Sequence, residues 1–227
     1  MGIKKNKILI FGLNDFAELA HYYITNDSDH DVEAFVVTKE YFEKNKFSPR
    51  GTNIEYPVEL FETIEAKYSP SEFLFFIPMS GIKMNKTRRD LYLKAKNKGY
   101  DFYSYISSHA TVLTEEIGEN CFIFEDNTIQ PFVTIGNNVT LWSGNHIGHH
   151  SCLMDHVFIT SHVVISGHVT IKERAWFGVN STIRDGITIE EGAMVAMGAL
   201  ITKNVEENSV MIGSPAKKHN VPADKLY

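Results

Sequence analysis

Cysteine is scarce in this sequence, since Cys121 and Cys152 are the only two among 227 residues. Two cysteines do not build a disulfide framework, so a reducing cytoplasm is the expected location. Long apolar runs are missing as well, because none approaches the roughly 20 residues that cross a bilayer. The basic start Met1–Lys7 leads into a strand pattern and not into a signal peptide. Basic charge is not in excess either, and the net charge of −6 argues against nucleic-acid binding.

What the sequence does have is a strict six-residue period within an ordinary globular composition, 43% apolar and 22% charged. The large apolar residues at this spacing are Ile117, Ile123, Ile129, Ile135, Leu141, Ile147, Leu153, Ile159, Ile165, Ile171, Phe177, Ile183, Ile189, Val195 and Ile201. A short fixed period of this kind marks a β-solenoid built from hexapeptide repeats.

The rest of each hexad fits one short strand followed by one corner. Three places after each apolar residue the chain prefers Asn, Asp, Gly or His, and only Phe132 and Arg174 depart from this set. These types tolerate the positive φ that a sharp corner needs. Three hexads make one triangular coil, so the fifteen hexads of the repeat predict about five coils. Residues 18 apart should stack about 4.8 Å from each other, which would let the inward amides of Asn127 and Asn145 pair.

Ahead of the repeat, strand and helix patterns alternate. The alternation predicts an α/β domain with a small parallel sheet over 1–107, followed by a β-helix over 108–206 and a tail over 207–227. The expected strands are Lys7–Leu13, Val32–Thr38, Phe73–Pro78 and Phe102–Ile106, and the expected helices follow Asn14 or Asp15 and span Pro57–Lys67 and Asn85–Lys98.

Histidine is concentrated in the repeat. Four histidines, His150, His156, His162 and His168, occupy successive corners, where His is a tolerated turn residue. His149 differs, because it lies two places after an apolar residue, on the outer side of a strand, where no turn requires it. Its imidazole is a candidate general base for acyl transfer near neutral pH. The alternative is an exposed strand histidine without a role.

Gly167 stands three hexads after His149 and should occupy the same site one coil along. Without a side chain it would let a thioester approach the backbone, and its N–H could donate to the oxyanion of the tetrahedral intermediate. The alternative is an ordinary sharp bend. A base and an oxyanion donor on adjacent coils are what acyl transfer requires. His146, at the last hexad position, is the second candidate base.

With this repeat and these residues, the chain resembles the hexapeptide-repeat acyltransferases of the sialic-acid O-acetyltransferase and nucleotide-amino-sugar N-acetyltransferase type. The resemblance implies a left-handed parallel β-helix, a Rossmann-like front domain, a homotrimer, and acetyl transfer from acetyl-CoA to an amino or hydroxyl group of a sugar, expected to be nucleotide-linked, in surface polysaccharide biosynthesis. Relatives have a catalytic His at the position of His149 and a glycine at that of Gly167. They usually have an acidic residue, which orients the base, where this chain has His150; a partner chain or Asn145 could substitute. Some have a second His where this chain has Phe158.

The resemblance also implies a coenzyme A groove between neighbouring β-helices. The matching positions are Gly167, Val179, Ala196, Gly198, Lys203 and Lys217. Small residues there would admit the pantetheine arm, and the two lysines, with Lys218, would meet its phosphates. Outward aromatic residues such as Phe122, Trp142, Phe158 and Trp176 would form the subunit interface.

The acceptor site is less defined. The turn after the first expected strand does not read G-x-G-x-x-G, and relatives use a glycine-rich turn with a His here. The candidate contacts are Asn14, Asp15, Lys39, Ser80 and Arg88. Two other functions remain open. One is a metal hydrolyase like the hexapeptide carbonic anhydrases, although no two histidines between 109 and 168 are five apart as that resemblance requires. The other is an inactive binding protein. No metal is expected.

Overall fold

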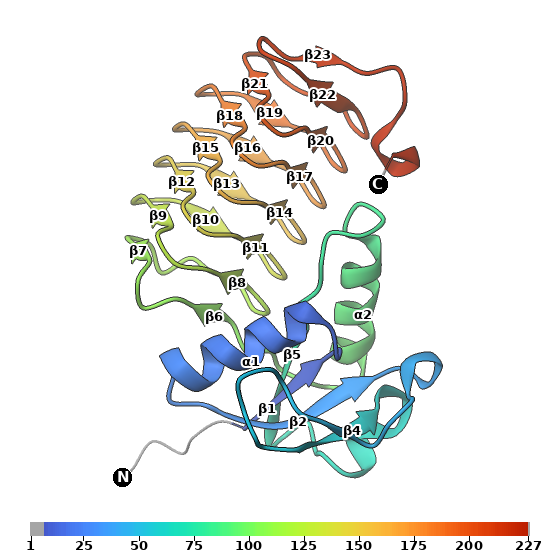
Figure 1. Ribbon diagram of the computed structural model, residues 1–227. Helices are drawn as coiled ribbons and strands as arrows, with labels where there is room; N and C mark the ends of the chain where they lie inside the picture. Colours follow the sequence, from blue (N-terminus) through green and yellow to red (C-terminus); the bar gives the residue numbers. More distant parts are fainter. Residues whose placement is uncertain (1–6, 227) are drawn as a thin grey trace. The chain divides into compact units, whose positions relative to one another are not determined.

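The computed structural model describes residues 7–226 (Figure 1). The chain divides into two compact units, one of residues 7–80 and 91–103 and one of residues 81–90 and 104–226. The helices are α1 (Asp15–Asp27) and α2 (Lys86–Asn97), with short 3-10 helices η1 (Lys39–Tyr41), η2 (Phe61–Ala66) and η3 (Ala223–Lys225). The strands of the first unit are β1 (Lys7–Phe11), β2 (Asp31–Val37), β3 (Lys46–Phe47), β4 (Tyr56–Leu60) and β5 (Phe73–Phe76).

The first unit is built on a five-stranded sheet in the order β3-β4-β2-β1-β5. All of its pairings are parallel except that of β3 with β4, so the predicted small parallel sheet is confirmed. The apolar residues Ile8, Leu9 and Ile10 of β1 are fully buried. Helix α1 begins after Asn14, whose side-chain oxygen accepts a hydrogen bond from the Ala17 N–H at 3.4 Å.

Two expected elements of the first unit are wrong. The segment predicted as one helix, Pro57–Lys67, contributes to strand β4, which pairs with β2, before the short helix η2 begins. Burial of Val58 in the sheet outweighs the local helical pattern. The expected strand Phe102–Ile106 is also split. Phe102 forms a single bridge with Phe75, whereas Tyr105–Ile106 pairs with Phe122–Ile123 in the second unit.

The second unit is a parallel β-helix with three faces. The first face contains β6 (Tyr105–Ile106), β8 (Phe122–Ile123), β11 (Thr140–Leu141), β14 (Phe158–Ile159), β17 (Trp176–Phe177), β20 (Met194–Val195), β22 (Val210–Ile212) and the antiparallel β23 (Lys217–Lys218). The second face contains β7 (Thr111–Val112), β9 (Thr128–Ile129), β12 (His146–Ile147), β15 (Val164–Ile165), β18 (Thr182–Ile183) and β21 (Leu200–Ile201). The third face contains β10 (Thr134–Ile135), β13 (Cys152–Leu153), β16 (Thr170–Ile171) and β19 (Thr188–Ile189).

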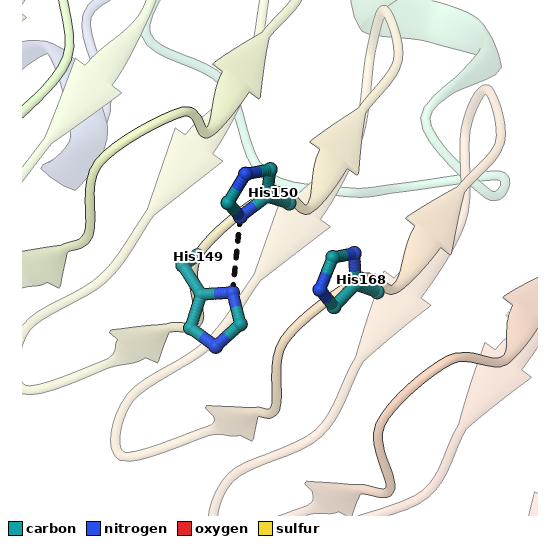
Figure 2. A group of neighbouring side chains, drawn as sticks. All are labelled: His149, His150 and His168. Atoms are coloured by element: carbon teal, nitrogen blue, oxygen red, sulfur yellow. Dashed lines mark hydrogen bonds between the residues drawn. The ribbon is translucent and has the colours of Figure 1, made fainter.

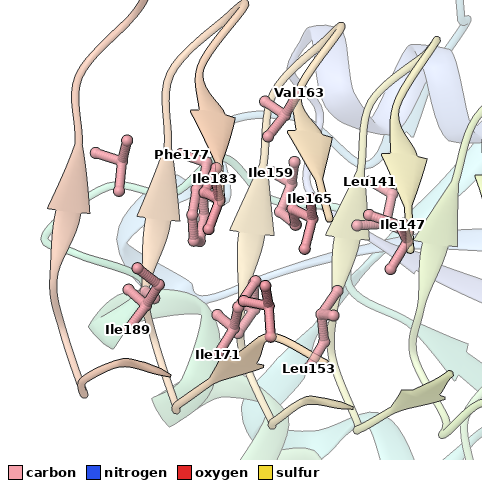
Figure 3. Close-up of a cluster of buried hydrophobic side chains, with 14 of the residues drawn as sticks. Leu141, Ile147, Leu153, Ile159, Val163, Ile165, Ile171, Phe177, Ile183 and Ile189 are labelled. Carbon is pink, nitrogen blue, oxygen red and sulfur yellow. The ribbon is translucent and has the colours of Figure 1, made fainter. Parts of the chain in front are cut away.

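The six-residue period fixes both the pairing and the core. Residues 18 apart pair, as Thr140 does with Phe158 and His146 with Val164. The large apolar residue of each hexad points inward, and from Ile123 to Ile201 these side chains form one continuous buried column. Figure 3 shows the part of this column from Leu141 to Ile189. Each coil therefore buries its core side chains against its neighbours, and the predicted solenoid is confirmed.

The helix has about six turns and not five, because the second face holds six strands. The added turns break the period. Tyr105 pairs with Phe122, and Met194 pairs with Val210, so each of these turns is slightly shorter than three full hexads. The repeat alone therefore did not predict the ends of the helix, and the last strands lie beyond residue 206.

Every corner from Asn120 to Gly198 takes the left-handed backbone conformation, whatever residue occupies it. The two that departed from the corner pattern, Phe132 and Arg174, have φ of 65° and 60°, like the histidines and asparagines stacked with them. The predicted pairing between the amides of Asn127 and Asn145 is wrong. Both side-chain NH₂ groups donate to the Trp142 carbonyl instead, because the inside of the coil offers them open carbonyl oxygens.

The aromatic residues expected to be exposed on the first face are not. The segment 81–90 packs on Phe158 and Trp176, whereas Phe122 packs on Tyr105 and Phe124, and Trp142 stacks on Phe124. Phe122 and Phe158 are only 1% and 4% exposed. The guanidinium of Arg88 lies over the Phe158 ring at 5.6 Å, and Gly81 lies against the indole of Trp176, where a Cβ would be 2.7 Å from Cδ1. Within residues 7–226, no helix is long and apolar enough to cross a membrane.

Arg88 anchors this segment and does not face solvent, contrary to its selection as an acceptor contact. It is 1% exposed and donates to the carbonyls of Asn138, His156 and Val157 and to the Thr140 hydroxyl, at 2.6 to 3.2 Å. None of these acceptors is a carboxylate. Burial of the charge lowers the pKa of Arg88 to about 9. The guanidinium remains charged at neutral pH and satisfies carbonyl oxygens of two adjacent coils.

Candidate active site

His149 stands directly before a corner of the β-helix, between the second and third faces. Its side chain is exposed. Its backbone N–H donates to the Gln130 side-chain oxygen at 2.9 Å, which ties it to the preceding coil. The next residue, His150, has φ 59° and turns the chain toward the third face. The imidazole therefore projects from a rigid backbone position.

His150 contacts the imidazole of His149 directly (Figure 2). The two Nδ1 atoms are 3.1 Å apart and the rings are close to perpendicular, at 88°. One of these nitrogens must carry a proton and the other must accept it, since two bare lone pairs would repel. His150 therefore stands where an acidic residue would orient the base. Asn145 does not take that part, because its side-chain oxygen accepts from the Val163 N–H at 2.7 Å inside the coil.

Gly167 lies beside His149 on the next coil, as the spacing of 18 predicted. A Cβ on Gly167 would be 2.7 Å from His149 Cε1 and 2.9 Å from Nε2, so the imidazole occupies the space that any side chain would need. The φ of Gly167 is not in the left-handed region, so a sharp bend does not explain this glycine. Within residues 7–226, no group accepts a hydrogen bond from the Gly167 N–H. That donor is free for a ligand.

Two further aromatic side chains stack on the same corner. Phe132, His150 and His168 occupy it on three successive coils, and each has a positive φ. The His150 and His168 rings are parallel within 15° at 4.9 Å, and Phe132 lies 4.7 Å from His150. Phe132 is nevertheless 70% exposed. A large side chain in a left-handed conformation that buries little of its area is an unfavourable local choice, which is typical of a functional position.

The second candidate base, His146, lies on strand β12 and is half buried. It pairs through the backbone with Val164, and among the described residues it makes no hydrogen bond to the imidazoles of His149 and His150. The position where some relatives have a second His, Phe158, is buried on the first face. The structure thus gathers His149, His150 and Gly167 and leaves His146 outside this group.

The positions expected to hold coenzyme A border the opposite edge of the second face. Val179 and Gly198 lie on adjacent coils, joined by a hydrogen bond of 2.8 Å from the Gly198 N–H to the Val179 carbonyl. Ala196 lies two residues before Gly198, which forms the corner with a φ of 65°. This corner belongs to a second column, between the first and second faces. Both this column and the corner of His149 flank the strands β12, β15, β18 and β21. The two sets of residues share one face but not one corner.

The lysines near the end of the helix differ in how they are paired. Lys218 forms an ion pair with Glu206, and the hydrogen bond from Lys218 lowers the pKa of that carboxyl group. Lys203 and Lys217 are exposed and have no carboxylate partner within residues 7–226. Both ammonium groups are therefore available to an anionic ligand.

In the first unit, strand β1 lies between β2 and β5, so the loops after β1 and β5 leave the sheet at a topological switch point. Asn14 follows β1 and Ser80 follows β5. The other two candidates have partners. Asp15 forms an exposed ion pair with Arg50 at 3.5 Å, and the Lys39 backbone N–H donates to the Glu62 carboxylate at 3.2 Å.

Comparisons with known proteins first identify the type of repeat. Residues 116–149 match the family described as bacterial transferase hexapeptide (six repeats), and residues 168–203 match the hexapeptide repeat of succinyl-transferase. Together with the fold, these matches confirm the predicted resemblance: the chain is a hexapeptide-repeat protein with an α/β unit in front of a left-handed parallel β-helix. A comparison with curated protein sequences finds no match.

Solved structures resemble the chain over nearly its whole length. The acetyltransferase domain of PglB from Neisseria gonorrhoeae is 20% identical, with a TM-score of 0.80, and the match covers 95% of this chain and 100% of that one. A perosamine N-acetyltransferase from Caulobacter crescentus, solved with CoA and GDP-perosamine, is 19% identical, with a TM-score of 0.81 and coverage of 95% and 98%. WeeI from Acinetobacter baumannii is 21% identical, with a TM-score of 0.76 and coverage of 95% and 100%. At these identities the likeness establishes the shared fold.

Proposed function

We propose that the protein is an acetyltransferase that moves an acetyl group from acetyl-CoA to an amino or hydroxyl group of a nucleotide-linked sugar, in the biosynthesis of a surface glycan. The observation that carries this proposal is the imidazole of His149 lying against Gly167, whose amide N–H donates to no group within residues 7–226. It is supported by the structural neighbours, since the PglB acetyltransferase domain has been solved in complex with acetyl coenzyme A and the perosamine N-acetyltransferase in complex with CoA and GDP-perosamine.

In the proposed mechanism His149 is the general base, and His150 holds the His149 imidazole in the tautomer that the base needs. His149 Nδ1–H donates to His150 Nδ1 across the 3.1 Å contact, which leaves Nε2 of His149 as the acceptor. Nε2 takes a proton from the acceptor amine or hydroxyl as its nitrogen or oxygen attacks the thioester carbonyl carbon. The Gly167 N–H donates to the resulting oxyanion. When the C–S bond breaks, the proton passes from Nε2 to the departing sulfur.

Coenzyme A would lie over the second face in this proposal. Gly167 and Gly198 border that face at its two corners, and Lys203 lies beyond its last strand, β21. An extended pantetheine arm would then run from the imidazole of His149 toward Lys203 and Lys217, whose unpaired ammonium groups would bind the phosphates. The expected result is that Lys203→Gln raises the KM for acetyl-CoA about tenfold at constant kcat, whereas the paired Lys218→Gln has little effect. Equal effects of the two variants would contradict this placement.

The acceptor would bind at the switch point of the front sheet. Asn14 and Ser80 offer polar groups there, and the carboxylate of Asp15 at the start of α1 disfavours a phosphate on the helix N-terminus itself. We therefore propose that the sugar, and not its diphosphate, contacts Asn14 and Asp15. This assignment of the sugar to Asn14 and Asp15 is tested by comparing the turnover of a nucleotide-linked amino sugar with that of the free sugar.

We also propose that the active form is a homotrimer. Three exposed apolar side chains, Phe132, Val164 and Met197, lie on the second face or at its edges and are 70%, 41% and 75% exposed. A neighbouring subunit would cover them and close the groove for coenzyme A. Light scattering of the purified chain is expected to give three chain masses, and a monomer would contradict a shared groove.

Release of free CoA thiol, followed with a panel of sugar acceptors, tests the function itself. His149→Asn is expected to lower kcat/KM by about 10² to 10⁴, which is the usual contribution of a general base. His150→Glu, which restores an acidic partner, is expected to retain activity, and His150→Ala to lower it. His162→Asn is the matched control, because it removes an exposed histidine from a different corner. Full activity in His149→Asn would show that the base is assigned wrongly.

A further inference from the structure

Three imidazoles form a cluster at the corner between the second and third faces: His149, His150 and His168, called here the three-histidine cluster (Figure 2). One ring nitrogen from each lies within 4.8 Å of the other two, and all three side chains are exposed. His150 and His168 share the same backbone conformation on adjacent coils, with φ of 59° and 58°. The rigid stacking of the coils therefore holds three imidazole nitrogen ligands on one small patch.

The spacing of these nitrogens suits a tetrahedral metal ion. Two ligands at the usual Zn–N distance of about 2.0–2.1 Å are about 3.3 Å apart. The Nδ1 atoms of His149 and His150 are already 3.1 Å apart. The His168 nitrogen must approach by about 1.5 Å at most, which a rotation of an exposed side chain supplies. Three imidazoles with the fourth position left for water form a donor set that Zn²⁺ prefers.

We propose that the three-histidine cluster binds one divalent transition-metal ion of the zinc type and that this ion switches off acyl transfer. The binding stands on the geometry of the cluster alone; only the switching rests on the proposed function. In the metal-free protein one proton lies between the two Nδ1 atoms of His149 and His150. The metal ion displaces that proton and takes both lone pairs.

The loss of activity on metal binding follows from the coupling between Nδ1 and Nε2 of the His149 imidazole. A neutral imidazole carries a single N–H, so its proton must be on Nε2 when Nδ1 ligates a metal. Nε2 of His149 then has no lone pair with which to take a proton from the acceptor. The metal thus removes the base without moving the backbone, and a chelator restores it. The exposure of the cluster lets the ion enter and leave from solvent.

The test uses the full-length protein, stripped of metal with a chelator and carrying no polyhistidine tag. Calorimetry with Zn²⁺, and the visible absorption of bound Co²⁺, are expected to show one ion per chain. His168→Gln is expected to weaken binding at least tenfold, because one of three ligands is lost. His162→Gln is the matched control, since His162 has the same corner conformation, with φ of 58°, on another corner column. It should bind metal like the wild type.

Absence of binding, or an equal loss in His168→Gln and His162→Gln, overturns the proposal. Turnover is then measured against free Zn²⁺. At about 100 times the Kd, wild-type activity should fall about 100-fold by mass action and return with chelator, and His168→Gln should need at least tenfold more zinc for the same loss. Tight zinc binding with unchanged turnover refutes the switch. A metal-free protein that turns over no sugar acceptor refutes the acetyltransferase function and leaves the binding result to stand by itself.

Discussion

His156 should make the β-helix unfold more easily in mild acid. It occupies a corner column with Asn120 and Asn138, and its Nδ1 lies 2.9 Å from the Asn138 side-chain nitrogen. The amide NH₂ can only donate, so Nδ1 must be the acceptor and the imidazole must be neutral. Burial, and next the nearby charge of Arg88, lower the pKa of His156 to about 4, from an ordinary value of 6.5.

The sign of the effect follows from this depression. The folded chain binds the proton less readily than the unfolded chain, so the stabilisation is fully present above about pH 6.5 and is lost as the pH falls through 4. For these two pKa values the loss is about 2 kcal/mol at pH 5 and about 3 kcal/mol at pH 4. His156 is 5% exposed, so solvent screening reduces the effect little.

The perturbation that isolates this effect is His156→Asn, which continues the asparagine column and removes the titratable group. Urea unfolding of the wild type and the variant is measured at pH 7.5, 5 and 4. The wild type should lose about 2 kcal/mol more than the variant between pH 7.5 and pH 5. His162→Asn, the exposed corner histidine, should behave like the wild type. Parallel pH profiles for the wild type and His156→Asn would refute the buried, neutral imidazole.

Three other substitutions test single contacts. Gly167→Ala should lower kcat about 10²-fold, because its Cβ would displace the His149 imidazole. The stability should change little, because the backbone conformation of residue 167 accepts alanine. Unchanged turnover would contradict this reasoning. Arg88→Lys should destabilise the protein by at least about 2 kcal/mol in urea unfolding, because one ammonium group cannot reach acceptors on two coils. An unchanged free energy of unfolding would show that the two-pronged guanidinium is dispensable. Phe132→Asn should weaken the proposed trimer, because the ring is 70% exposed in the single chain and would be covered by a neighbouring subunit, whereas asparagine tolerates the corner at φ 65°. An unchanged subunit association in light scattering over a dilution series would contradict this role for Phe132.

The regular part of the fold could be predicted because the six-residue spacing of the hexads is constant. Each hexad supplies one large inward residue, in most cases a second and smaller one, and one corner, so the pairing partner of any residue is found by adding 18. That arithmetic also placed Gly167 beside His149. It fails at the ends, where Tyr105 pairs with Phe122 and Met194 pairs with Val210, both short of a full coil. Nothing in the apolar pattern signals these shorter turns.

Side-chain partners were harder to predict than the backbone register. The contact of His149 with His150 depends on rotamers, and the sequence showed only a missing acid. The burial of Phe158 depends on Arg88, which stands far earlier in the chain and which the local pattern presents as one more cation of a basic helix. Such long-range packing outweighs what a short window of sequence can indicate.

The exact spacing of the coils carries a consequence for how this chain tolerates insertion and deletion. The removal of one residue between His149 and Gly167 shifts the register of every later strand and turns inward side chains outward. The loss of one complete coil, residues 150–167, instead keeps the register and brings Asp185 opposite the imidazole of His149. Insertions and deletions in this β-helix are therefore tolerated best as whole coils, and a binding surface can be changed by exchanging one coil for another.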